Sequence, residues 1–222
     1  MVECRSLGVA KTMAIQADLL DPQVGPKLVR QVLDGLGATN IDILVNNAVL
    51  TSMSMLEPFE EMTAEGFGKI MQGNVFGTMS ITNAVLPHLP AKGGRVINIS
   101  SVASKIANMD PLMGYGASKA AVDSFTRSLA AAYGVKTRAT FNSVSVAATE
   151  TDAFRASLEL FGQSVPNIEE LMISGHTAEK RVAQPEDVAF IVGFLASEES
   201  RWINGAQIPA NGGHMLALAL QG

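Results

Sequence analysis

Short apolar runs and segments with helical periodicity alternate along this chain. The apolar runs predict strands at residues 12–17, 41–45, 96–99, 139–145 and 206–210. Apolar residues at helical spacing predict helices at 22–36, 63–86 and 185–196, and a further helix that opens near Tyr115. Residues 1–7 are typical of the last turn of a helix that Gly8 ends. This alternation favours an α/β fold with a mostly parallel sheet.

The composition narrows the class of protein. The length of 222 residues suits one domain with a sizeable core. Hydrophobic residues make up 47% of the chain and charged residues 17%, yet no apolar run approaches the length that spans a membrane. The net charge of −5 and the absence of a Lys/Arg cluster argue against a nucleic-acid surface. We therefore expect a small-molecule partner, with no nucleic acid and no membrane.

The cysteine content and the first residues bear on location. Cys4 is the single cysteine, which excludes a disulfide framework. Glu3, Arg5 and Lys11 lie where a signal peptide needs an apolar core. These features predict a cytoplasmic protein. The three histidines lack metal-ligand spacing, so we assign no metal site.

Candidate chemistry concentrates between the strand at 96–99 and the helix that follows it. The strand ends in Ser100 and Ser101, and the helix opens with Tyr115 and Lys119 four residues apart. This spacing places the phenol and the ammonium on one helix face. A nearby cation favours the phenolate and lowers a tyrosine pKa from its usual value of about 10. The pattern indicates general acid/base catalysis on a carbonyl or an alcohol.

Several motifs together resemble the short-chain dehydrogenase/reductase family over nearly the whole chain. They are the Tyr-x-x-x-Lys pair, the INISS strand end, the Asn-Asn-Ala strand end at 46–48, and Asn74 within GNVFG. The resemblance implies one Rossmann-like, doubly wound domain over 1–222, with residues 154–180 as a substrate lid. The lid's apolar residues are equally explained as plain packing. They are Phe154, Leu158, Phe161, Leu171 and Met172.

The resemblance also implies a catalytic set. Tyr115 would protonate the carbonyl oxygen, and Lys119 would lower the pKa of Tyr115 and hold the nicotinamide ribose. Ser101, chosen over Ser100 for its spacing to Tyr115, would polarise the carbonyl. Asn74 would hold a water that links Lys119 to solvent. The alternative for Asn74 is an amide that satisfies a helix kink.

Four further positions match cofactor-binding positions of the family, in addition to Tyr115 and Lys119. Asn47 would lie beside the adenosine ribose, and Asp18 would meet the adenine edge. Either residue could instead cap the helix that follows. Thr149 and Thr151 match the loop that grips the nicotinamide amide and the phosphates.

The chain also departs from the family pattern. Full-length members begin with a strand, a glycine-rich phosphate-binding turn, a helix and a second strand, and we expect this truncated domain to lack them. The strand at 12–17 then either moves inward to pair with 41–45 or leaves a hydrophobic sheet edge exposed. Val49 replaces a glycine, and Val146 and Ala147 replace a Pro-Gly pair. These changes would weaken cofactor binding.

The leading hypothesis is an NAD(P)(H)-dependent oxidoreductase that interconverts a ketone and a secondary alcohol, with NADP(H) favoured over NAD(H). Two alternatives stay open. One is a pseudoenzyme or assembly subunit that has lost dinucleotide binding, and the other is a cofactor-independent acid/base enzyme. The family resemblance further implies a homodimer or homotetramer.

Overall fold

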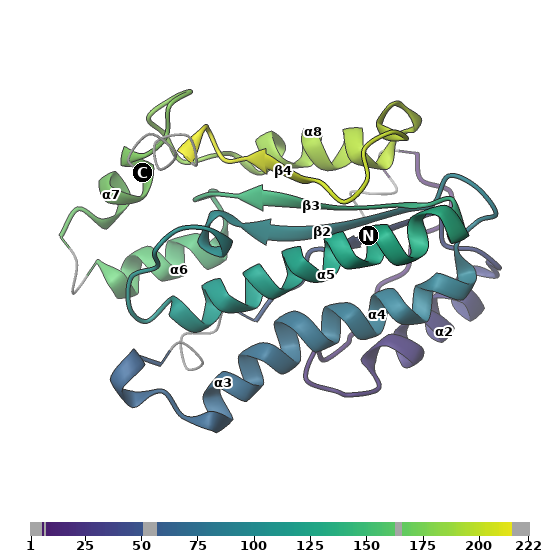
Figure 1. Ribbon diagram of the computed structural model, residues 1–222, viewed down its shortest axis with the longest axis horizontal. Helices are drawn as coiled ribbons and strands as arrows, with labels where there is room; N and C mark the ends of the chain where they lie inside the picture. Colours follow the sequence, from purple (N-terminus) through teal and green to yellow (C-terminus); the bar gives the residue numbers. More distant parts are fainter. Residues whose placement is uncertain (1–5, 7, 51–56, 163–165, 215–222) are drawn as a thin grey trace.

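The protein folds around a four-stranded parallel sheet. The computed structural model describes residues 6, 8–50, 57–162 and 166–214, so most of the predicted helical turn at 1–7 lies outside the described residues. The strands within the described residues are β1 (Ile43–Asn46), β2 (Arg95–Ser101), β3 (Thr140–Val146) and β4 (Gln207–Ala210). They are adjacent in the order β1-β2-β3-β4, and every pairing is parallel. The predicted α/β class is confirmed (Figure 1).

Helices cover both faces of this sheet. They include α2 (Val24–Leu36), α3 (Ala64–Met71), α4 (Thr78–Val85), α5 (Met113–Thr137) and α8 (Pro185–Ala196). Two further helices, α6 (Asp152–Phe161) and α7 (Ile168–Ser174), lie between β3 and α8. Single 3-10 turns occur at η2 (Phe59–Glu61), η4 (Leu86–His88), η5 (Val102–Ser104) and η6 (Glu198–Ser200).

The predicted helix at 63–86 is present, but its middle is not α-helical. The segment η3 (Gln72–Gly77) forms a π-helix between α3 and α4. Thr63 caps the start of this helical run by accepting a hydrogen bond from the Gly66 N–H. A π-helical turn inside an α-helix is often found at functional sites. Asn74 lies within this turn.

Two apolar layers hold the helices against the sheet. On one face, Val96 and Phe141 pack with residues of α5, and Leu44 and Leu86 lie against them. On the other face, Ile97 and Val144 pack with Leu195 of α8. Neighbouring residues of one strand therefore point to opposite layers, as the two-residue period of a strand requires. Figure 1 shows α4 and α5 in front of the sheet and α8 behind it.

The prediction of a strand at 12–17 is wrong. Those residues form no strand in the structure, and β1 is the edge strand of the described sheet. Ile43 and Val45 are 46% and 39% exposed. A strand needs a partner for its backbone N–H and C=O groups, and residues 12–17 pair with no neighbouring strand. The outcome matches the second expectation, a partly exposed apolar sheet edge.

Helix α5 runs antiparallel to β2, and this pairing builds the site. Three contacts show the relative direction of the two elements. They join Thr126 to Asn98, Lys119 to Ile99, and Tyr115 to Ser101. Residue numbers on α5 therefore decrease in the direction in which those on β2 increase. The N-terminal end of α5 therefore lies at the carboxyl end of β2. Gly116 permits this approach, because a Cβ there would lie 2.8 Å from the Ala103 carbonyl oxygen.

Candidate active site

Ser101 and Tyr115 meet at the carboxyl end of β2. Ser101 lies close enough to Tyr115 to lower the pKa of the phenol by a hydrogen-bonding interaction, and the Ser101 hydroxyl accepts a hydrogen bond from the Ala103 N–H at 3.2 Å. The bond from Ala103 caps the 3-10 turn η5, which fixes the serine oxygen. Ser100, by contrast, is buried, and its hydroxyl has no hydrogen-bond partner in the structure. The geometry therefore brings Ser101, not Ser100, to the phenol.

Lys119 lies one helical turn from Tyr115 and is 5% exposed. Its Nζ donates a hydrogen bond to the Ile99 carbonyl oxygen at 2.7 Å and lies 5.8 Å from the centre of the Tyr115 ring. Burial lowers the pKa of Lys119 to about 8, and the charge of Asp123 opposes this shift. The ammonium is thus held in a desolvated place beside the phenol.

The expected effect on the tyrosine has the wrong sign. Burial raises the pKa of Tyr115, and the hydrogen-bonding interaction with Ser101 only partly offsets this. Lys119 is not among the groups that shift the pKa of Tyr115, and its ammonium donates to a main-chain carbonyl. The phenol is therefore protonated at neutral pH. This is the form that can donate a proton.

Residues from the predicted lid bury the phenol. Ile168 of α7 is buried, and Leu158, Met172, Leu112 and Tyr115 pack against it. Leu171 is 51% exposed, so it is not part of this packing. Residues of the predicted lid and the candidate proton donor thus share one apolar cluster. The side chain of Phe161 lies outside the described part.

Asn74 is connected to this site through Ser118. Its side-chain amide donates to the Ser118 hydroxyl at 3.2 Å, and that hydroxyl donates to the Tyr115 carbonyl oxygen at 2.7 Å. The Asn74 amide also pairs with Leu50, accepting from its N–H at 2.7 Å and donating to its carbonyl at 3.2 Å. The buried Asn74 amide therefore has hydrogen-bond partners in Leu50 and Ser118 at the π-helical turn.

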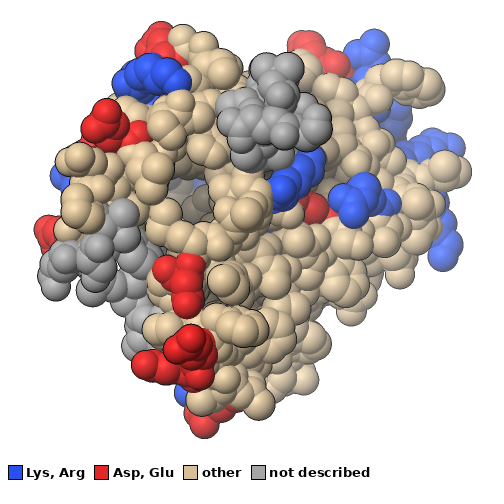
Figure 2. Space-filling view, turned by 60° about the vertical axis from the view of Figure 1, so that its left-hand side comes forward, with Lys and Arg blue, Asp and Glu red and all other residues tan. Residues whose placement is uncertain are grey.

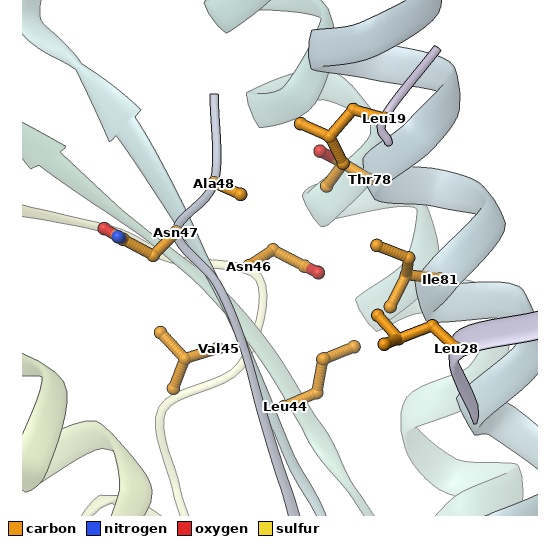
Figure 3. A pocket seen from close by; sticks show the side chains of 9 residues that line it. All are labelled: Leu19, Leu28, Leu44, Val45, Asn46, Asn47, Ala48, Thr78 and Ile81. Atoms are coloured by element: carbon orange, nitrogen blue, oxygen red, sulfur yellow. The ribbon is translucent and has the colours of Figure 1, made fainter. Parts of the chain in front are cut away.

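Asn47 lies just beyond β1, beside a pocket of about 150 Å³ (Figure 3). Leu19, Leu28, Thr78 and Ile81 lie across this pocket from the strand. The side chains of Val45 and Asn47 point to the opposite side of the strand from Leu44 and Asn46. Asn47 is exposed. It therefore lies at the carboxyl edge of the sheet, where open α/β sheets bind ligands.

The other three predicted cofactor residues form local turns. Asp18 is exposed, and its carboxylate accepts a hydrogen bond from the Leu20 N–H at 2.9 Å. Thr149 donates from its hydroxyl to the Ala147 carbonyl oxygen at 3.0 Å. Thr151 accepts from the Phe154 N–H at 3.2 Å and so caps α6. The hydroxyls of the two threonines are thus already engaged with the main chain of their own loop.

A buried polar network that the sequence analysis missed lies below the site. The Asn46 amide donates to the Thr82 hydroxyl at 3.0 Å and to the Asn98 side-chain oxygen at 2.8 Å. Asn98 in turn donates to the Thr126 hydroxyl at 2.8 Å. The sequence did contain a signal for this network. The polar residues Tyr115, Lys119 and Thr126 recur at helical spacing, which places Thr126 on the same helix face as the other two. The network ties β1, β2, α4 and α5 together.

The carboxyl edge of the sheet faces forward in Figure 2. Uncharged atoms make up most of this face, with small separate groups of acidic and basic side chains. No group of three or more His, Cys, Asp or Glu residues that could hold a metal occurs within the described residues. A search of the same residues finds no helix with the length and apolar character needed to cross a bilayer.

Comparison with known proteins identifies the family. The family model described as "Enoyl-(Acyl carrier protein) reductase" matches residues 3–215. The chain is 54% identical over 211 residues to "Short chain dehydrogenase asqE" of Emericella nidulans, covering 95% of this chain and 77% of that protein. It is 33% identical to "Hydroxynaphthalene reductase arp2" of Aspergillus fumigatus, covering 88% of this chain and 70% of that protein.

Solved structures agree with this assignment. The NADP-bound angucycline C-6 ketoreductase LanV matches with a TM-score of 0.80 and 33% identity, over 96% of this chain and 79% of that one. A short chain dehydrogenase from Burkholderia cenocepacia in complex with NADP matches with a TM-score of 0.83 and 28% identity, over 96% of this chain and 80% of that one. The chain belongs to the matched family and is an oxidoreductase of the short-chain dehydrogenase/reductase class.

Proposed function

We propose that this oxidoreductase interconverts a ketone and a secondary alcohol, with Tyr115 as the proton donor and NADP(H) as the cofactor. One observation carries the proposal. The Ser101 hydroxyl and the Tyr115 phenol lie within interaction distance at the carboxyl end of β2, one helical turn from the buried ammonium of Lys119. This is a pair of donors beside a fixed cation, which suits an oxygen that gains negative charge.

The residues at this edge fit a nicotinamide dinucleotide. Lys119 has a buried ammonium directed to the carboxyl half of β2, and exposed Asn47 follows β1 at the same edge. In the proposal these two residues hold the nicotinamide ribose and the adenosine ribose. Thr149 and Thr151 hold the loop after β3 for the nicotinamide amide and the phosphates, while Asp18 meets the adenine edge. The bound cofactor supplies a hydride.

The chain's own residues handle the proton. Because the pKa of Tyr115 is raised, the phenol is protonated at neutral pH and donates to the carbonyl oxygen. Ser101 donates a second hydrogen bond to that oxygen and orients it. In the proposal Lys119 holds the nicotinamide ribose beside the phenol, and Asn74 holds the water through which the proton is returned.

The substrate we infer is an apolar cyclic ketone. The support is the apolar cluster of Ile168, Leu158, Met172 and Leu112 that packs around Tyr115. The names of two relatives agree with it, since one is a hydroxynaphthalene reductase and another an angucycline ketoreductase. The NADP complexes among similar structures support the choice of NADP(H).

A second candidate function is a subunit that keeps the fold without binding dinucleotide. The exposed edge of β1 favours it, because Ile43 and Val45 are uncovered beside the candidate adenosine position. Titration of the purified protein with NADPH and with NADH separates the two functions. We expect saturable binding that is tighter for NADPH. Absence of saturable binding by both would contradict the reductase and favour the subunit.

The catalytic claim has its own assay. We expect ketone-dependent oxidation of NADPH that falls by about 10³-fold in Tyr115→Phe, because the proton donor is removed while the ring is kept. Cofactor binding by this variant is the control, and it should stay within about two-fold of the parent. A different outcome is turnover of the substrate in the absence of a nicotinamide cofactor. If Tyr115→Phe abolished that activity, the result would support cofactor-independent acid/base chemistry.

We also propose a cytoplasmic homodimer or homotetramer that pairs through α4 and α5. Ala117 and Ala120 lie exposed on the outer face of α5, where a partner helix could approach closely. Gly73 and Gly77 do not contribute to such a face, because they are buried against Leu50 and Leu19. Sedimentation velocity tests the assembly, and a monomer at micromolar concentration would contradict it.

A further inference from the structure

A buried carboxylate lies one helical turn beyond Lys119. Asp123 is 4% exposed, and it is the only carboxylate among the buried residues of the described part. Burying a charge is costly unless the charge is paired or hydrogen-bonded. No role has been assigned to this group so far, and its place on the same helix face as Tyr115 and Lys119 calls for one.

Both carboxylate oxygens of Asp123 accept hydrogen bonds from other elements. Oδ1 accepts from the Ser143 hydroxyl of β3 at 2.8 Å, and Oδ2 accepts from Nε2 of Gln207 on β4. The same Nε2 donates to the Ser104 hydroxyl at 3.1 Å. Ser104 ends the 3-10 turn that begins directly after Ser101. Asp123 thus connects α5 to the turn that holds the candidate serine.

Among the described residues, Asp123 is the charged group that raises the pKa of Lys119 against the effect of burial. The helix α5 also presents the Tyr115 phenol, and β2 presents the Ile99 carbonyl. The neutral groups of Ser143 and Gln207 face this side of α5 from β3 and β4. In a desolvated layer, a negative charge one turn away favours the protonated lysine.

We propose that Asp123 is a positioning residue of the reductase site, which keeps Lys119 charged and holds the Ser101 turn against α5. The proposal rests on the proposed function for its catalytic meaning. Asp123 acts through Lys119 and Ser101 and does not touch the substrate. Its electrostatic part concerns only the charge state of Lys119, so that part can be tested without any assay of turnover.

The first test follows Lys119 itself. Protein labelled with ¹³C at the lysine Cε is titrated by NMR, and the Lys119 signal is identified by its loss in Lys119→Arg. We expect Asp123→Asn to move the Lys119 titration to lower pH, because the opposing charge is removed. Asp123→Ser is a second neutral variant, which keeps the test possible if the first does not fold.

Two control variants separate charge from packing. Ser143→Ala removes one hydrogen bond but keeps the carboxylate, and Thr126→Val removes a neutral hydrogen bond from the same helix face. Both variants should leave the pH at which Lys119 titrates unchanged. An unchanged titration in Asp123→Asn, or an equal change in Thr126→Val, would overturn the electrostatic role.

The second test uses turnover. We expect kcat/KM of Asp123→Asn to fall by about 10-fold near pH 9 and by about two-fold or less near pH 6.5, since the lysine loses its proton earlier. A pH-independent loss would agree only with the holding of the Ser101 turn and would contradict the electrostatic role of Asp123. If the parent protein reduces no ketone, the proposed function fails, while the titration still decides whether Asp123 sets the charge of Lys119.

Discussion

The ammonium of Lys119 donates a hydrogen bond to the main-chain carbonyl of Ile99 at 2.7 Å. Through this contact the buried lysine fixes the register of α5 on β2. One helical turn earlier on α5 and two residues further along β2, Tyr115 meets Ser101. One turn along the axis of α5 and two residues along β2 both span about 6 Å. The contacting residues of the helix and the strand therefore stay side by side.

The buried lysine is expected to cost stability at neutral pH. Its pKa falls from 10.5 in the unfolded chain to about 8 in the folded protein, so the folded state binds fewer protons between these values. Stability therefore rises as pH increases from about 8 to about 10.5, and the cost is complete below pH 8. We expect Lys119→Met to raise the free energy of unfolding by about 1–3 kcal/mol near pH 7 and to abolish turnover.

Urea denaturation of both proteins near pH 7 and near pH 10 measures this difference. The stability that the variant gains over the parent should be smaller near pH 10, because the parent lysine is then largely neutral in the folded state and a charge is no longer buried. A variant that is less stable than the parent at both pH values would contradict the expectation.

The two adjacent serines should respond differently to alanine. Ser101→Ala removes the hydroxyl that interacts with Tyr115 and should lower kcat by about 10²-fold. Ser100→Ala removes a buried hydroxyl that has no hydrogen-bond partner, so its activity should be unchanged and its stability unchanged or higher. Steady-state kinetics and thermal denaturation measure the pair. Equal losses of activity in both variants would refute the assignment of Ser101.

The apolar cluster over Tyr115 should control the affinity for an apolar ketone. Met172 packs in that cluster, whereas its neighbour Leu171 on α7 is 51% exposed. Met172→Gln places an amide against apolar side chains and should raise KM by about 10-fold. Leu171→Gln is the matched control and should leave KM unchanged. If both variants behave alike, α7 does not line the substrate site.

The hydrogen bonds that join Asn46, Asn98 and Thr126 should stabilise the fold. Asn98→Ala leaves Asn46 without one acceptor and Thr126 without a donor, and it opens a cavity between the sheet and α5. We expect a loss of about 2–4 kcal/mol in the free energy of unfolding. Asn83→Ala on the exposed face of α4 should change it by less than about 0.5 kcal/mol. Urea denaturation measures both, and similar losses would contradict a structural role for the network.

Local signals in the sequence predicted much of the fold. The helix predicted at 185–196 has those bounds in the structure, because Pro185 and Asp187 form a strong helix start there. The strands β2, β3 and β4 differ from the predicted ranges by at most two residues at either end. Tyr115 and Lys119 share a helix face because their spacing requires it.

Contacts between distant segments decided the rest. Residues 12–17 have the pattern of a strand but form none, because a strand depends on a partner that no local pattern specifies. The pKa of Tyr115 rises rather than falls, because the phenol is desolvated in a cluster to which α6 and α7 contribute.

The sequence by itself determined which chemical groups are present and which helix or strand presents them. The tertiary structure decided their charge states and partners, because both depend on burial. Burial results from segments more than forty residues apart, such as Tyr115 and Ile168, meeting across the end of the sheet.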